Sequence, residues 1–284
     1  MNILTPEWPA PKNVRSLQTT RHGGVSGAPY ASLNLGDHVG DAPLAVERNR
    51  MLLEPLLPSE PVWLKQVHGV TVTDAAQADC WPEHPQGVRR WDPRCCAATL
   101  PQADACVSAH PGAVCVVMTA DCLPVLLCDD SGSVVGAVHA GWRGLCDGVI
   151  EQTVQAMKVP PTTLMAWLGP AIGAKAFEVG DEVRAAFVAR QPQAAAAFTP
   201  SPPTGFAPLA TLSPQAGEGG AVVPGEGKKW LADIYQLARL RLHALGITRI
   251  YGGGLCTYTD SARFFSYRRD GATGRMGTFI WLAQ

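Results

Sequence analysis

The residues Cys122 and His139 stand at the two ends of an apolar stretch, residues 119–144, with the sequence TADCLPVLLCDDSGSVVGAVHAGWRG. If strands 123–129 and 133–139 pair through the Asp-Asp-Ser-Gly turn, the thiol and the imidazole lie near the same edge of a sheet. Such a pair can act as nucleophile and base, or it can bind a soft divalent metal. An ordinary buried thiol near a hydrogen-bonding histidine is the third interpretation of this spacing.

His68 is a further candidate, because it ends an apolar run in WLKQVHGVTV and precedes a glycine, as at the exit from a strand. One Cys and two His form a three-ligand set that leaves the fourth position of a zinc ion open for water or substrate. Zinc held in this way can lower the pKa of a bound water to about 7. Because the thiol binds as thiolate, metal affinity should fall on acidification.

Arg143 lies between Gly141 and Gly144, at the predicted start of a helix. Free backbone N–H groups and the helix dipole favour an anion at such a place. The guanidinium can hold a phosphate or a carboxylate through two hydrogen bonds. It can equally cap local carbonyl groups, and the sequence leaves both interpretations open.

The elements around these residues combine hairpins with amphipathic helices. Val- and Leu-rich runs with short turns between them predict four antiparallel strands, at 104–109, 113–119, 123–129 and 133–139. The remaining pattern predicts a helix after Arg143, a strand near 163–168, a helix from about Asp181, a helix over 229–246, and strands near 248–256 and 277–283. This succession indicates an α+β sandwich with layered sheets, built as a single domain over residues 1–284.

Two segments show neither the hydrophobic period of a helix nor that of a strand. Residues 199–227 are dense in Pro, Gly, Ser and Ala, which predicts a flexible surface insertion, with a functional lid as the alternative. Residues 81–102 contain four prolines and are interpreted as a loop.

Composition and charge exclude several classes of protein. The formal net charge is −1 and no basic face or like-charge block occurs, so we expect no binding to nucleic acid or to an anionic membrane. No apolar run approaches the roughly 20 residues that span a bilayer. Seven histidines without a single His-x-His pair cannot furnish a four-copper array.

The cysteines indicate a reducing compartment. Their number, nine, is odd, and the start MNILTPEWPA lacks the basic and apolar regions of a secretory signal. We therefore expect mostly reduced thiols in a cytoplasmic protein. Cys106, Cys115 and Cys128 are expected to be small buried hydrophobes in strands.

An ordered set of motifs resembles one known family. The strings are TTRHGGVSGAPYASLNLGDHVGD, KQVHG, TADCLPVLL, VHAGWRG, GPAIG with FEVG, and CTY with FFSYRRDG and TGRMGTFIWL. From about Thr19 to the C-terminus they closely resemble the YfiH family, also called the laccase-domain or polyphenol-oxidase family.

This resemblance implies an α/β/β/α layered fold and a zinc site. It carries the metal ligands and catalytic residues over to His68, Cys122 and His139, all intact here. Members are described as enzymes that cleave adenosine, inosine, guanosine or methylthioadenosine with phosphate and that deaminate adenosine. Our first hypothesis is therefore a zinc-dependent purine nucleoside phosphorylase with adenosine deaminase activity, in which Arg143 binds substrate and the partners are small-molecule nucleoside and phosphate.

Other functions stay open at this stage. Some members are described as peptidoglycan editing factors, so a hydrolase acting on UDP-muramyl-serine is the alternative. A copper polyphenol oxidase ranks lower on the histidine pattern, although copper itself can occupy such a ligand set. A non-catalytic binding protein also ranks lower, since a scaffold has no need of three intact metal-ligand positions. The oligomeric state is left open.

Overall fold

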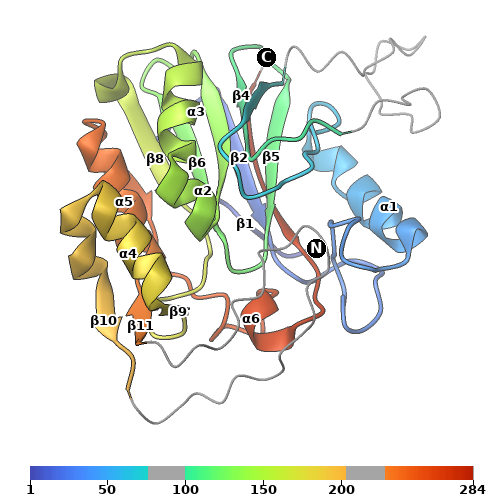
Figure 1. Cartoon of the computed structure of the whole chain (residues 1–284). Coiled ribbons are helices and arrows are strands. Elements are labelled where there is room, and N and C mark those ends of the chain that lie inside the picture. Colours follow the sequence, from blue (N-terminus) through green and yellow to red (C-terminus); the bar gives the residue numbers. More distant parts are fainter. Residues whose placement is uncertain (76–99, 203–227, 284) are drawn as a thin grey trace.

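The computed structural model describes residues 1–75, 100–202 and 228–283. Figure 1 shows two sheets packed face to face, with α2, α3, α4 and α5 on one side and α1 on the other. This arrangement confirms the predicted single-domain α/β/β/α sandwich.

A six-stranded sheet contains most of the predicted hairpins. Its strands, in spatial order, are β12 (Arg249–Gly252), β8 (Leu164–Leu168), β6 (Leu123–Asp129), β7 (Val135–Ala140), β4 (Ala105–Ser108) and β3 (Val72–Asp74). The pairs β6–β7, β6–β8 and β4–β7 are antiparallel, whereas β12–β8 and β3–β4 are parallel. In the β6–β7 register Pro124 faces His139, so the start of β6 and the end of β7 lie at the same edge, as the sequence predicts.

The second sheet corrects one prediction. It has the order β1 (Ile3–Leu4), β2 (Val14–Thr19), β13 (Met276–Leu282) and β5 (Val114–Thr119). The run at 113–119 therefore does not form a hairpin with either neighbour in the chain, because it crosses to this sheet and pairs with β13. All six residues of β5 are buried, so its sequence carries no polar face that would reveal which sheet it joins. The core between the sheets includes Cys106, Cys115 and Cys128, each fully buried as expected.

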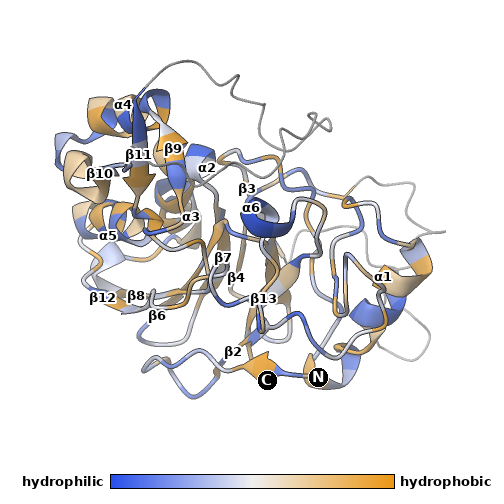
Figure 2. Cartoon of the chain, turned by 90° about the horizontal axis from the view of Figure 1, so that it is seen from below, coloured by the Kyte–Doolittle hydropathy of each residue, from blue (hydrophilic) through white to orange (hydrophobic). Residues whose placement is uncertain are grey.

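The described residues form six α-helices, and all but the last of them cover the outer faces of the two sheets. They are α1 (Pro43–Met51), α2 (Trp142–Asp147), α3 (Val149–Met157), α4 (Asp181–Arg190), α5 (Ile234–Ala244) and α6 (Tyr267–Asp270), with short 3-10 turns η1 (Glu54–Leu56), η2 (Pro161–Thr163) and η3 (Pro192–Ala197). Seen from below in Figure 2, α6 is a hydrophilic helix near the middle of the molecule. The helix predicted after Arg143 is interrupted at Gly148, whose φ of 105° ends α2. No helix in the described residues is long and apolar enough to cross a membrane.

A third, three-stranded sheet corrects the helix predicted over 229–246. Its order is β10 (Phe198–Pro200), β11 (Lys229–Ala232) and β9 (Glu178–Gly180). The first four residues of the predicted helix form β11, and α5 begins after Asp233, whose carboxylate caps it by accepting the N–H of Gln236. The predicted insertion 199–227 begins inside β10, and its residues 203–227 lie outside the described residues. Most of the predicted loop 81–102 lies outside them as well.

Candidate metal centre

Three segments of the chain bring His68, Cys122 and His139 together. His68 comes from the loop before β3, Cys122 directly precedes β6, and His139 lies near the end of β7. One ligand atom from each lies within 4.8 Å of the other two. The sulfur of Cys122 is 3.7 Å from Nε2 of His68, and the two imidazole centroids are 4.8 Å apart. The side chains that the sequence singles out for metal binding therefore converge on one point.

Left-handed backbone at two positions aims two of these ligands. His68 has a φ of 61° and Asp121, just before Cys122, has a φ of 87°. Each such non-glycine residue costs about 1–2 kcal/mol, so contacts nearby must hold it. The carboxylate of Asp121 accepts the hydroxyl of Thr257 at 2.6 Å and the N–H of Arg268 at 2.7 Å. These two bonds fix the turn that presents the Cys122 thiol.

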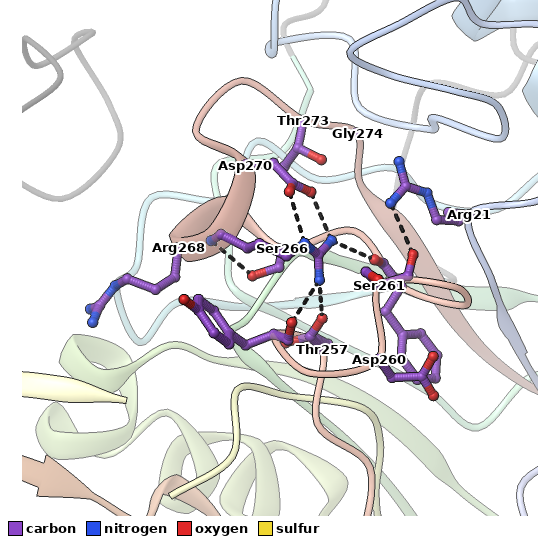
Figure 3. A network of polar contacts seen from close by, with 12 residues as sticks. Arg21, Thr257, Asp260, Ser261, Ser266, Arg268, Asp270, Thr273 and Gly274 are labelled. Carbon is purple, nitrogen blue, oxygen red and sulfur yellow. Dashed lines mark hydrogen bonds and ion pairs between the residues drawn. The ribbon is translucent and has the colours of Figure 1, made fainter. Parts of the chain in front are cut away.

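The segment 257–270, a loop followed by α6, supplies those two donors and is itself held by a polar network (Figure 3). The guanidinium of Arg269 donates to the carbonyls of Thr257 and Phe264 and pairs with Asp270. Phe264 and its neighbour Phe265 are fully buried. The network therefore sets the position of the loop that contacts Asp121.

Two glycines at the start of α2, the N-cap Gly141 and Gly144 within the helix, allow the close approach of the ligands. A Cβ at Gly141 would lie 2.7 Å from Cδ2 of His68 and 3.1 Å from the sulfur of Cys122. A Cβ at Gly144 would lie 2.7 Å from the carbonyl oxygen of Gly69. The two contacts at 2.7 Å are shorter than side chains tolerate, so the glycines around Arg143 are explained by packing against the ligand loops.

Electrostatics in the centre favour a thiolate beside an imidazolium. Burial alone raises the pKa of the Cys122 thiol, but the imidazoles of His139 and His68 lower it to about 6. Burial alone lowers the pKa of His139, whereas the Cys122 thiolate and the Asp104 carboxylate raise it to about 9. Burial also raises the pKa of Asp104, and its hydrogen bond with His139, 2.8 Å from Oδ1 to Nδ1, brings that pKa below its usual value.

The donor set fits a metal ion. Among residues 1–75, 100–202 and 228–283, the one group of three or more His, Cys, Asp or Glu side chains spaced to hold a metal is His68, Cys122 and His139. Because Asp104 occupies Nδ1 of His139, the Nε2 atom of that ring is left as a ligand. A sulfur and two nitrogens are ligands that zinc and copper both accept. The group can therefore bind a metal ion.

Arg143 lies on α2, within two residues of Gly141. Its guanidinium is 4.8 Å from the centroid of the Trp142 ring, and within the described part of the chain it has no carboxylate partner. A second cation near the centre, Arg268, is exposed and points away from the other labelled side chains in Figure 3. Both guanidiniums have donors left for an anion.

Sequence reasoning missed the roles of Asp104 and Asp121. Each is buried, with 0% and 9% exposure, and each stands at or just before the start of an apolar strand. A carboxylate at the entrance to a fully buried strand is the signal that could have revealed them, because such a group must find donors.

Comparison with known proteins identifies the family of the chain. The family model described as multi-copper polyphenol oxidoreductase laccase matches residues 15–283. The chain belongs to this family, which is the YfiH family that its motifs predict.

Relatives cover nearly the whole chain. It is 50% identical over 279 residues to the purine nucleoside phosphorylase of Pseudomonas aeruginosa, covering 98% of each protein. It is 49% identical over 282 residues to the purine nucleoside phosphorylase YfiH of Escherichia coli, covering 99% of this chain and 98% of that protein. A Neisseria meningitidis protein of the DUF152 family superposes with a TM-score of 0.82 at 46% identity and 100% coverage of both chains.

Proposed function

We propose that this protein is a zinc-dependent purine nucleoside phosphorylase that also deaminates adenosine. The observation that carries the proposal is the convergence of one thiol and two imidazoles, drawn from three segments, within 4.8 Å. The similarity to proteins named purine nucleoside phosphorylase, at 49–50% identity over almost the full length, supports the substrate class. Adenosine, inosine, guanosine and methylthioadenosine are the proposed nucleosides.

The three ligands are the proposed metal-binding and catalytic residues. His68, Cys122 and His139 hold the ion, and Asp104 keeps His139 oriented through Nδ1. A zinc ion held there would supply Lewis-acid chemistry. Zinc is favoured over copper because one thiolate with two imidazoles is a common open zinc set, whereas copper oxidases need many more histidines than this chain has.

Arg143 is the proposed phosphate-binding residue. In phosphorolysis an oxygen of phosphate attacks C1′ of the ribose, the bond from C1′ to the purine nitrogen breaks, and the purine leaves with the electron pair and takes up a proton. A guanidinium neutralises the phosphate and orients it. Replacing Arg143 by Gln should raise KM for phosphate by about 10-fold or more, with KM for the nucleoside nearly unchanged. Initial rates at varied phosphate check this, and equal KM values would contradict the role of Arg143.

The proposed location is the cytoplasm. All six cysteines in the described segments are free, although Cys106 and Cys115 are close enough to influence each other. Free cysteine thiols are typical of proteins in a reducing compartment.

The test is a product assay on zinc-loaded protein. Adenosine with phosphate should give adenine and ribose 1-phosphate, and adenosine without phosphate should give inosine and ammonia. The matched control is Cys128→Ala, because Cys128 is a fully buried thiol on β6 outside the centre. We expect Cys128→Ala to keep both activities and Cys122→Ala to lose them. Absence of every product from zinc-loaded wild-type protein would end the proposal.

A further inference from the structure

We propose that Asp104 is the positioning residue of the metal centre, holding both histidine ligands through one carboxylate. The inference rests on the proposed metal centre and not on the nucleoside chemistry. It concerns a residue that contacts no substrate and acts through His68 and His139.

His139 makes two hydrogen bonds with Asp104. Its Nδ1 lies 2.8 Å from Oδ1 of Asp104, and its backbone N–H donates to the carbonyl oxygen of Asp104 at 2.7 Å. A carboxylate only accepts hydrogen bonds, so Nδ1 must carry a proton, and Nε2 is the ring nitrogen that can offer its lone pair to a metal once its own proton is displaced. The contact therefore selects the neutral tautomer that can bind a metal through Nε2. The backbone hydrogen bond fixes the main-chain position from which the imidazole extends.

The loop that carries His68 is bonded to Asp104 as well. The same carboxylate accepts three consecutive backbone N–H groups, from Val67 at 3.2 Å, His68 at 2.9 Å and Gly69 at 2.7 Å. This is the point where His68 adopts its left-handed φ of 61°. Three donors on one buried acceptor hold the loop in the conformation that turns the imidazole toward Cys122.

These hydrogen bonds give Asp104 a role beyond that of a purely structural carboxylate. Asp104 is fully buried and lies about 35 residues from each histidine in the chain, so its four hydrogen bonds join two otherwise separate segments. Each of these segments carries one of the proposed metal ligands. The relative position of the two imidazoles, whose centroids are 4.8 Å apart, thus depends on one side chain.

The chain offers a matched control in Asp129. This residue is also a buried aspartate, 3% exposed, and it also accepts backbone N–H groups, from Ser133 at 2.7 Å and Val134 at 3.0 Å. It lies at the opposite end of the β6–β7 hairpin. It forms no bond with a metal ligand in the described residues.

The experiment compares Asp104→Asn with Asp129→Asn in the full chain. Zinc affinity is measured by competition with a chromophoric chelator, and the visible absorption of the cobalt-substituted protein reports ligand geometry. Unfolding of the metal-free proteins is followed in parallel. An asparagine at 104 presents an amide N–H to groups that are themselves donors, so we expect zinc affinity to fall about 10–100-fold and the cobalt spectrum to change. Asp129→Asn should lower the unfolding temperature and leave both metal readouts at wild-type values.

The outcomes separate the possible failures. Wild-type zinc affinity and cobalt spectrum in Asp104→Asn would overturn the role of Asp104. The same losses in Asp129→Asn would also overturn it, because they would reflect general destabilisation. If Asp104→Asn does not fold, Asp104→Ser, which removes the carboxylate without adding an amide, is measured in the same way. Wild-type protein that binds zinc but turns over no nucleoside would contradict the proposed function alone, and wild-type protein that binds no zinc would contradict both proposals.

Discussion

The two ends of the β6–β7 hairpin use buried carboxylates in opposite ways. At the turn, Asp129 accepts hydrogen bonds from Ser131, Ser133 and Val134, all within five residues. At the other end, Asp121 accepts from Thr257 and Arg268, which are 136 and 147 residues away in the chain. The same two apolar strands therefore connect a locally closed turn to a centre assembled over long range.

This difference explains where stability and chemistry reside. A turn that satisfies its own carboxylate needs nothing else and offers no group to a ligand. The centre instead leaves a thiol and two imidazoles close together, where Cys122 and His139 favour their thiolate and imidazolium forms and no local turn closes off the ligand atoms. We expect changes at the turn to affect folding and changes at the centre to affect metal binding.

Removing a ligand should have the largest effect. In Cys122→Ala the metal content should fall from near one per chain to about a tenth or less, because two imidazoles alone bind zinc weakly, and activity should fall by about 10³-fold or more. Elemental analysis and the product assay check this, with Cys128→Ala as the control of the same residue type on the same strand. Equal metal content in the two variants would contradict the assignment of Cys122, and not Cys128, as a metal ligand.

The pH dependence of metal binding should also be large. With a pKa of about 9, His139 is protonated in the metal-free protein below that pH, so binding displaces one proton. Below the Cys122 pKa of about 6 the thiol is protonated as well, and binding displaces two. Zinc affinity should thus fall about 10-fold per pH unit on acidification from pH 9 toward 6, and about 100-fold per unit below that. Chelator competition between pH 5 and 8, corrected for protonation of the chelator, measures the slopes, and a flat profile would contradict the assigned ligands.

A single methyl group at the centre should have a smaller but clear effect. In Gly141→Ala the added Cβ would meet Cδ2 of His68 at 2.7 Å and the sulfur of Cys122 at 3.1 Å, so one ligand must move. We expect zinc affinity to fall about 10–100-fold, while the unfolding temperature of the metal-free protein changes little. Unchanged affinity would show that the ligands are not packed as closely as described.

The turn should give the smallest effect on metal. Asp129→Asn removes a charged acceptor of backbone N–H groups, which should lower the free energy of unfolding by about 1–3 kcal/mol. Denaturant unfolding measures that loss. Zinc affinity should remain at the wild-type value, and a parallel loss would mean that the two ends of the hairpin are not independent.

The same contrast between local and long-range contacts decides what the sequence predicts. The β6–β7 hairpin, β8, α4 and β13 follow from periodicity and turn residues, which are local signals. The crossing of β5 to the other sheet is invisible, because a strand buried on both faces is compatible with either sheet. The sequence pattern predicts helix where β11 lies, because the apolar residues of this strand also fit the helical stripe of α5.

The site shows the same limit. The types of His68, Cys122 and His139, together with the strand ends on which they stand, suffice to propose a ligand set. The roles of Asp104 and Asp121 depend on partners 35–147 residues away, which no local pattern contains.

X-ray absorption at the zinc edge of the wild-type protein tests the central claim most directly. The account predicts one tightly bound zinc per chain with one sulfur neighbour at about 2.3 Å and nitrogen neighbours, two of them imidazole, at about 2.0–2.1 Å. A spectrum with no sulfur neighbour, or with only weakly bound oxygen neighbours, would contradict it.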